Sequence, residues 1–218
     1  NTTEYRSAAE KMLGLPQVHM KIGTIYYEQG LHLKSLDEFQ LVRFQDQSRE
    51  ILMVLSRVYE ILGRVDSAID ELEILREIEP QSIRLMAYAA RLYSLDSRPR
   101  ETVRLLQNAI VTAPQNDTLY HSLALAHISV DQLDSAIERM QQAIALNKNK
   151  DSYYFELGAL LERTGEYENA VQNMKRTIEL NPTHSNAHNF LGYMYATQGK
   201  SLDEALDHLQ TALSIQPK

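Results

Sequence analysis

The sequence predicts an all-α protein built from repeated helical hairpins, and three observations support this class. The 218 residues are rich in Leu, Ala, Glu, Gln, Arg and Ile but include only 8 Gly and 6 Pro, which favours helices over turn-rich β structures. Amphipathic stretches of about a dozen residues alternate with short turns. These stretches recur with a period of 34 residues, which indicates one structural unit used many times.

Composition and charge narrow the class of function. With 44% apolar residues the chain can bury a sizeable core. The net charge of −7 argues against a nucleic-acid partner, because phosphate binding needs a clustered positive field. The absence of cysteine excludes disulfides, thiolate metal sites and cysteine nucleophiles.

The sequence also bears on location. No apolar run approaches the about 20 residues of a membrane span, so we expect no membrane insertion and a soluble protein, either cytoplasmic or associated with a bacterial periplasm or envelope. The opening stretch NTTEYRSAAEK lacks the basic and apolar regions of a signal peptide. Because the chain begins at Asn1 rather than methionine, we expect a mature form or a fragment of a longer protein.

The internal repeat is the strongest signal. The octapeptides VDSAIDEL, LDSAIERM, YENAVQNM and LDEALDHL share one motif, and they align at Ala68, Ala136, Ala170 and Ala205. The period predicts two further copies, at Thr102 in RPRETVRLLQNAI and at Ser35 in HLKSLDEF. Each copy follows a second pattern, such as ELGALLERTG or FLGYMYATQG, so each predicts two helices joined by a tight turn.

This pattern resembles the tetratricopeptide repeat family over about residues 16–218. In the last copy Leu191, Gly192 and Tyr195 match the family's first helix, and Ala205 and Ala212 match its second. The resemblance implies a right-handed α-solenoid of about six helix-turn-helix repeats. We expect an N-terminal helix at 1–15, followed by repeats at approximately 16–48, 49–82, 83–116, 117–150, 151–184 and 185–218.

Two glycines of the fifth copy, in FELGALLERTGEYENAV, have separate explanations. We expect Gly158 where the two helices approach closely, because a larger side chain would overpack the contact. Gly165 is expected to end the first helix in a left-handed conformation. The last copy has one additional residue between Gly199 and Ala205, which predicts a bulge in its turn.

The resemblance further implies a concave wall, lined by the first helices, that binds a protein, a peptide or a helix. Residues one turn apart on these helices give the candidate partner-binding set: Met20, Thr24, Tyr27, Met53, Arg57, Arg84, Tyr88, Arg91, His121, Leu125, Ile128, Phe155, Glu162, Asn186, Asn189 and Tyr193. The same projection turns Glu60 inward. Arginines in this set suit carboxylates. The Lys and Asn clamp of chaperone-binding members is missing, so we expect no chaperone-tail receptor.

Other motifs are better explained by the repeat. ATQGKS at 196–201 ends like a phosphate-binding loop, but Met194 stands where that motif needs glycine. His184 and His188 have the spacing of metal ligands without an evident third ligand. We interpret them as a surface pair, with Ser185 or Asn186 as the helix N-cap. The sequence therefore predicts no catalytic residue, no cofactor and no metal site, and the protein is not expected to be an enzyme.

The expected function is a non-catalytic scaffold for protein–protein interactions. Similarity of the last two copies to long bacterial members suggests an envelope assembly or transport complex. One alternative is a homo-oligomeric platform built by end-to-end stacking through the last repeat, where Leu206, Leu213 and Ile215 would be partly exposed. Another is a regulatory or substrate-presenting part of a larger enzyme.

Overall fold

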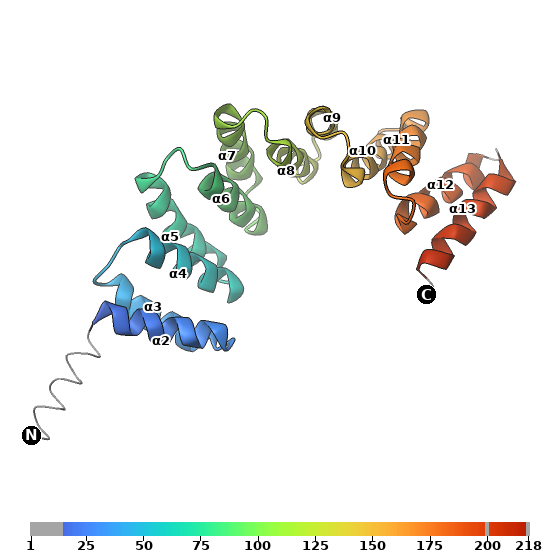
Figure 1. Ribbon diagram of the computed structural model, residues 1–218. Helices are drawn as coiled ribbons and strands as arrows, with labels where there is room; N and C mark the ends of the chain where they lie inside the picture. Colours follow the sequence, from blue (N-terminus) through green and yellow to red (C-terminus); the bar gives the residue numbers. More distant parts are fainter. Residues whose placement is uncertain (1–14, 199–200, 217–218) are drawn as a thin grey trace, which may run out of the picture. The chain divides into compact units, whose positions relative to one another are not determined.

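The computed structural model describes residues 15–198 and 201–216. These described residues form twelve α-helices and no strand, which confirms the predicted all-α class (Figure 1). In chain order the helices are α2 (Pro16–Glu28), α3 (His32–Arg43), α4 (Arg49–Ile61), α5 (Val65–Ile78), α6 (Ile83–Leu95), α7 (Pro99–Thr112), α8 (Asp117–Ile128), α9 (Leu133–Leu146), α10 (Asp151–Arg163), α11 (Tyr167–Leu180), α12 (Ser185–Gln198) and α13 (Leu202–Ile215).

The helices form two compact units, which we call unit 1 (Asn1–Thr112) and unit 2 (Ala113–Lys218). Within each unit, consecutive helices pack in pairs as hairpins: α2 with α3, α4 with α5 and α6 with α7 in unit 1, then α8 with α9, α10 with α11 and α12 with α13 in unit 2. Inside a unit, the second helix of a hairpin also packs against the first helix of the next one: α3 against α4 and α5 against α6 in unit 1, and α9 against α10 and α11 against α12 in unit 2. Nearly all of the N-terminal helix predicted at 1–15 lies outside the described residues.

Small residues allow the two helices of a hairpin to approach closely. A Cβ atom built on Gly158 of α10 would lie 3.2 Å from the carbonyl oxygen of Ala170 on α11, which confirms the predicted close approach. On Gly192 of α12 it would lie 2.6 Å from Leu209 Cγ on α13. At the corresponding crossing in unit 1, the buried Ser56 hydroxyl donates to the Ala68 carbonyl oxygen at 2.9 Å. At each of these helix crossings, the points where the two helices of a hairpin come closest, only a small side chain fits between the helices.

The turn inside a hairpin begins with a residue in the left-handed conformation. Gly165 has φ +84°, as predicted for the end of the first helix. Ser97 and Asp131 adopt positive φ at the equivalent turns of their own hairpins. The bulge predicted after Gly199 falls partly outside the described residues, and Ser201, directly before α13, has φ +54°. Left-handed geometry thus ends helices even where glycine is absent.

The hydrophobic core lies between successive hairpins as well as within them. In unit 1, Phe39 and Val42 of α3 are buried in one cluster with Ile51, Leu55 and Val58 of α4. Burying such side chains contributes about 1.5–3 kcal/mol each. Because the core continues from one hairpin to the next, each pair of helices depends on its neighbour for burial of its apolar face.

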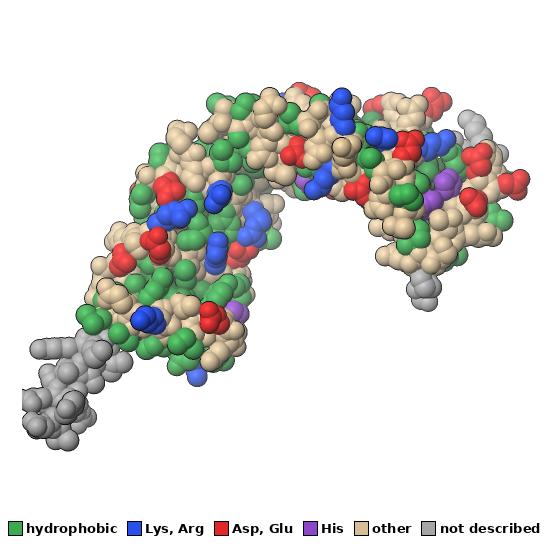
Figure 2. Space-filling model, viewed as in Figure 1, with side chains coloured by type: hydrophobic (Ala, Val, Ile, Leu, Met, Phe, Trp, Pro, Cys, Tyr) green, Lys and Arg blue, Asp and Glu red, His purple; other side chains and the backbone are tan. Residues whose placement is uncertain are grey.

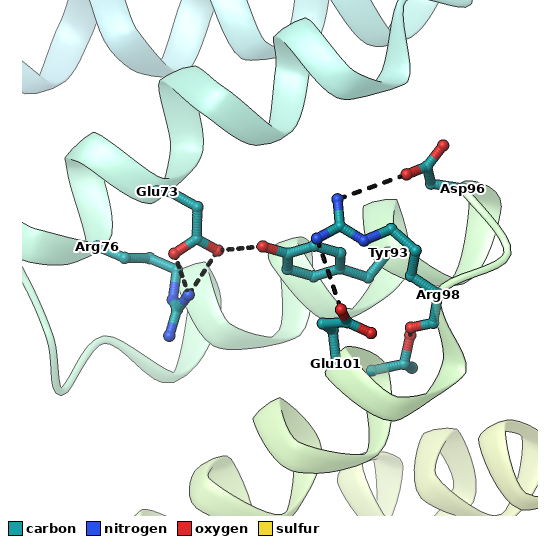
Figure 3. A network of polar contacts seen from close by, with 7 residues as sticks. Glu73, Arg76, Tyr93, Asp96, Arg98 and Glu101 are labelled. Carbon is teal, nitrogen blue, oxygen red and sulfur yellow. Dashed lines mark hydrogen bonds and ion pairs between the residues drawn. The ribbon is translucent and has the colours of Figure 1, made fainter.

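A polar network joins α5, α6 and α7 of unit 1 (Figure 3). The hydroxyl of the buried Tyr93 donates to Glu73 Oε1 at 3.0 Å, and Arg76 donates to both oxygens of Glu73 at 2.6 Å. The Arg98 guanidinium lies 4.5 Å from the centre of the Tyr93 ring. Burial and the hydrogen bond to Glu73 raise the pKa of Tyr93. The network satisfies a buried hydroxyl, so we assign it a structural role.

In unit 2, a polar clip joins the start of a hairpin to its end. Asn147 Nδ2 donates to Asp117 Oδ2 at 2.9 Å, and Asn181 Nδ2 donates to Asp151 Oδ2 at 2.8 Å. These asparagine bonds lower the pKa of both carboxyl groups, and burial opposes the shift. In unit 1, an ion pair joins residues that are also 30 positions apart: Arg49 Nε lies 2.7 Å from Glu79 Oε1.

We predict a pH-dependent stability difference between the wild-type chain and Asp151→Asn. The folded pKa of Asp151 lies below its ordinary value of 3.8. The stabilisation is therefore complete above that value and is lost as pH falls through the folded pKa. Near neutral pH the variant should lose about 1 kcal/mol, because Asn181 then donates to a neutral amide oxygen in place of a carboxylate. Urea unfolding followed by circular dichroism at several pH values measures the difference. A gap that stays constant below pH 3.8 would contradict the assignment.

The crossings give a second prediction, in which Gly192→Ala destabilises the chain more than Gly158→Ala. At Gly192 the new methyl group would meet the branched carbon of Leu209 and the Ala205 carbonyl, and overpacking typically costs about 1–3 kcal/mol. At Gly158 the nearest atom is the mobile methyl end of Met174. Thermal unfolding of both variants tests the order. A larger loss of stability in Gly158→Ala than in Gly192→Ala would show that the close helix contact does not set the cost.

Candidate functional site

The main cleft of unit 1 has a volume of about 700 Å³ and is lined by α2, α4 and α6, the first helices of their hairpins. Its lining residues are Tyr27, Arg49, Met53, Arg57, Glu60, Ile61, Arg84, Tyr88 and Arg91. Six of the sixteen predicted binding residues therefore share one cleft: Tyr27, Met53, Arg57, Arg84, Tyr88 and Arg91. Basic side chains gather among hydrophobic ones over α4–α6 in Figure 2.

Helical spacing explains how these side chains reach one surface. On α4, Met53, Arg57 and Glu60 lie three or four residues apart, so they share one face of the helix. The other face of α4 carries Leu52 and Leu55, which are fully buried. An amphipathic first helix thus turns its apolar side to the core and its mixed side to the cleft.

Glu60 is the only carboxylate that lines this cleft among the described residues, and it is already engaged. Arg91 donates from both terminal nitrogens to its two oxygens, with Nη2 at 2.8 Å from Oε2. The Tyr88 hydroxyl donates to the same Oε2 at 3.0 Å. The Arg91 hydrogen bonds lower the pKa of Glu60, while burial partly opposes the shift. Glu60 therefore stays ionised and neutralises Arg91.

The remaining arginines leave the cleft positively charged. Arg49 pairs with Glu79, whereas neither Arg57 nor Arg84 forms an ion pair within the described part of the chain. Both of these side chains are exposed to solvent. In a chain with net charge −7, two guanidinium groups without an ion pair make the surface of this cleft locally positive.

Residues of α2 line two further hollows of unit 1. A pocket of about 100 Å³ lies between α2 and α4 and is lined by Thr24, Tyr27, Phe39, Val54 and Arg57. Met20 and Thr24, both in the predicted set, also line a shallow groove along α2. Tyr27 thus lines the cleft and the pocket, Thr24 lines the pocket and the groove, and Met20 lines the groove.

The predicted residues of unit 2 are spread over α8, α10 and α12. On α8, Leu125 is 45% exposed, whereas His121 is half-buried, as is Ile128. His121 Nε2 lies 2.7 Å from Glu156 Oε2. This contact occupies the His121 side chain with a neighbour in the next hairpin.

On α10 and α12 the exposed predicted residues are polar or aromatic. Tyr193 is 61% exposed, and Asn186 and Asn189 are exposed as well. Phe155 is half-buried with its ring centre 4.6 Å from that of His184, and Glu162 is half-buried. Phe155 thus contributes to the packing of unit 2 in addition to its exposed edge.

His184 and His188 differ from their prediction in two respects. His188 is only 7% exposed, so it is not a surface residue. Its Nε2 lies 3.1 Å from the Pro182 carbonyl oxygen, and its Nδ1 lies 3.0 Å from His208 Nδ1. His184 precedes α12 as predicted, yet it caps the helix itself, because its Nδ1 accepts from the Ala187 amide at 3.1 Å. The predicted N-cap at Ser185 or Asn186 was wrong.

The described residues contain no group of three His, Cys, Asp or Glu placed to hold a metal ion. Burial and the neighbouring His188 lower the pKa of His208. Nor does any described helix combine the length and apolar character required to cross a membrane.

Arg49 and Ile61 line the cleft but were absent from the predicted set. Their spacing could have revealed them, since Arg49 lies four residues before Met53 and Ile61 lies four after Arg57. The cleft-facing side of α4 therefore extends over the whole helix, from Arg49 to Ile61.

One protein family and several solved structures are similar to this chain. The tetratricopeptide repeat model matches residues 121–176 and 161–218. The solved structure of MamA is 24% identical, covering 74% of this chain and 94% of its own, with a TM-score of 0.68. Pseudomonas aeruginosa PilF is 16% identical, covering 93% and 92%, with a TM-score of 0.68. YrrB, described as a tetratricopeptide repeat protein with an unusual peptide-binding site, is 20% identical, covering 82% and 92%, with a TM-score of 0.63.

Among curated proteins, no sequence matches the chain. The family match and the solved structures confirm the predicted resemblance to tetratricopeptide repeat proteins. The described residues accordingly have the all-α solenoid type of fold that these solved structures share.

Proposed function

We propose that the protein is a non-catalytic scaffold for protein–protein interactions, and that the cleft of unit 1 binds an acidic segment of its partner. The observation that carries this proposal is the pair Arg57 and Arg84, which line the cleft without an ion-pair partner among the described residues. Guanidinium groups bind carboxylates through paired hydrogen bonds. Tyr27, Tyr88 and Met53 add apolar and aromatic surface, which is typical of protein-binding sites.

The comparisons support this reading without identifying the partner. YrrB, with a similar fold, is described as having a peptide-binding site. The similarity of the last two repeats to long bacterial members favours a partner in an envelope assembly or transport complex. The net charge of −7 disfavours a nucleic acid, whereas a short acidic segment needs only the arginines of the cleft.

Self-assembly is a second candidate function, favoured by α13. Leu202 is 64% exposed, and Leu206 and Leu213 are each 57% exposed on this helix. In unit 2 the preceding second helix, α11, packs against the next first helix, α12. The α2 groove of a second copy, with Ile25 and Met20, would give α13 an apolar partner. Sedimentation at increasing concentration should then show oligomers that Leu206→Glu abolishes, and a monomer at every concentration would exclude it.

Acidic-segment binding predicts that Arg57→Gln combined with Arg84→Gln weakens binding of fluorescein-labelled hexaglutamate about tenfold, or about 1.4 kcal/mol. Both side chains are exposed, so thermal stability should change by less than about 0.5 kcal/mol. Fluorescence anisotropy at low ionic strength measures the affinity, which should also fall as salt is added.

The matched control is Arg104→Gln, which removes an exposed arginine of α7 that does not line the cleft. Its affinity for hexaglutamate should equal that of the wild type. If the control loses as much affinity as the double variant, or if hexaglutamate does not bind, the cleft assignment is wrong.

Glu60→Gln is predicted to have the opposite effect. The substitution keeps the shape of the side chain but removes the charge that occupies Arg91. Arg91 then becomes available to the ligand, and hexaglutamate should bind several-fold more tightly in the same anisotropy assay. Glu77→Gln, at an exposed position on α5, controls for the general change in net charge. Equal gains in both variants would show that Glu60 has no specific role.

A further inference from the structure

The small pocket beside the cleft adds a requirement for shape to the requirement for charge. Tyr27 and Arg57 line both the cleft and this pocket, so the two spaces are adjacent. Phe39 is 1% exposed and belongs to the core cluster of unit 1. Val54 is half-buried against the same cluster. The core of unit 1 therefore supports the pocket walls in fixed positions.

The size and chemistry of the pocket define what it can hold. Its volume is about 100 Å³, which is less than the about 150 Å³ of an apolar cavity that binds benzene. The pocket therefore matches one branched aliphatic side chain better than a larger aromatic one. Thr24 presents a methyl group, and Phe39 and Val54 are apolar, so the walls favour a hydrocarbon group.

Arg57 ties this pocket to the anion site. Its side chain is exposed and lines both spaces, and Arg84 lines the cleft from α6. Arg91 is engaged by Glu60, so the described cleft offers two unpaired arginines beside the apolar pocket. A ligand that uses both spaces must present its hydrophobic and its acidic group close together.

We infer that the partner segment carries a branched aliphatic side chain, Val, Ile or Leu, next to an acidic side chain. The aliphatic group enters the pocket between α2 and α4, and the carboxylate binds Arg57 and Arg84. This inference rests on the proposed function of the cleft and specifies its ligand. Segments that are acidic but lack the aliphatic group bind more weakly, and aromatic substitutes do not restore affinity.

A peptide selection tests this inference with random sequences in place of the natural partner. Random twelve-residue peptides displayed on phage are selected on the immobilised full chain, and the enriched sequences are synthesised with a fluorescein label. We expect an Asp or Glu close to a Val, Ile or Leu in these sequences. Replacing that aliphatic residue with Ala or with Phe should weaken binding to the wild-type chain about tenfold.

Thr24→Phe provides the matching change on the protein. Thr24 is exposed on α2 and lines the pocket, so a phenyl group at this position covers the pocket from its exposed side without replacing a core residue. The variant should bind the selected peptides about tenfold more weakly, and replacing the aliphatic residue should then cause no further loss. Thr24→Leu provides a smaller filling group, and circular dichroism shows whether both variants are folded.

Thr112→Phe is the control, since Thr112 is exposed at the end of α7 and lines neither space. This variant should retain wild-type affinity. Peptides that lose affinity with Arg84→Gln but show no dependence on the aliphatic residue would overturn this inference and leave the proposed function intact. Binding unaffected by Arg84→Gln, or no enriched peptide at all, would overturn both.

Discussion

The close approach of two helices at a small residue is the constraint on which the rest of this structure depends. At Gly158 and Gly192 the partner helix lies so near that a methyl group would meet its backbone or side chains. Ser56 meets the same constraint and adds a hydrogen bond to Ala68. These crossings set the rotation of each helix about its axis, and that rotation decides which side chains are buried.

The cleft of unit 1 follows from that rotation. Once Leu52 and Leu55 of α4 face the core, Met53 and Arg57 must face the other side. The first helices α2, α4 and α6 repeat this arrangement, so their outward residues meet in one cleft. Glu60 then lowers the positive charge of the cleft, because it binds Arg91. A packing requirement thus places the charged groups, and a single carboxylate decides how many of them remain available.

Much of this was predictable from the sequence, because it depends on residues close together in the chain. The period of the repeat gave the hairpins, Gly165 marked a turn, and helical spacing brought Arg57 and Arg84 to one surface. Contacts between distant residues were not predictable. His188 is buried through its contact with His208, 20 residues away, and the pairing of Arg91 with Glu60 spans 31 residues. Such contacts depend on how the hairpins pack, which the repeat period does not specify.

The most direct test of the central claim, that the cleft of unit 1 binds an acidic segment, is to locate the bound peptide by methyl NMR. With methyl-labelled methionines, Met53 reports on the cleft, while Met140 and Met174 are fully buried in unit 2. Titration with hexaglutamate should shift the Met53 signal, with the same affinity as in fluorescence anisotropy, and leave the other two signals in place. An unchanged Met53 signal at saturating peptide would contradict this account.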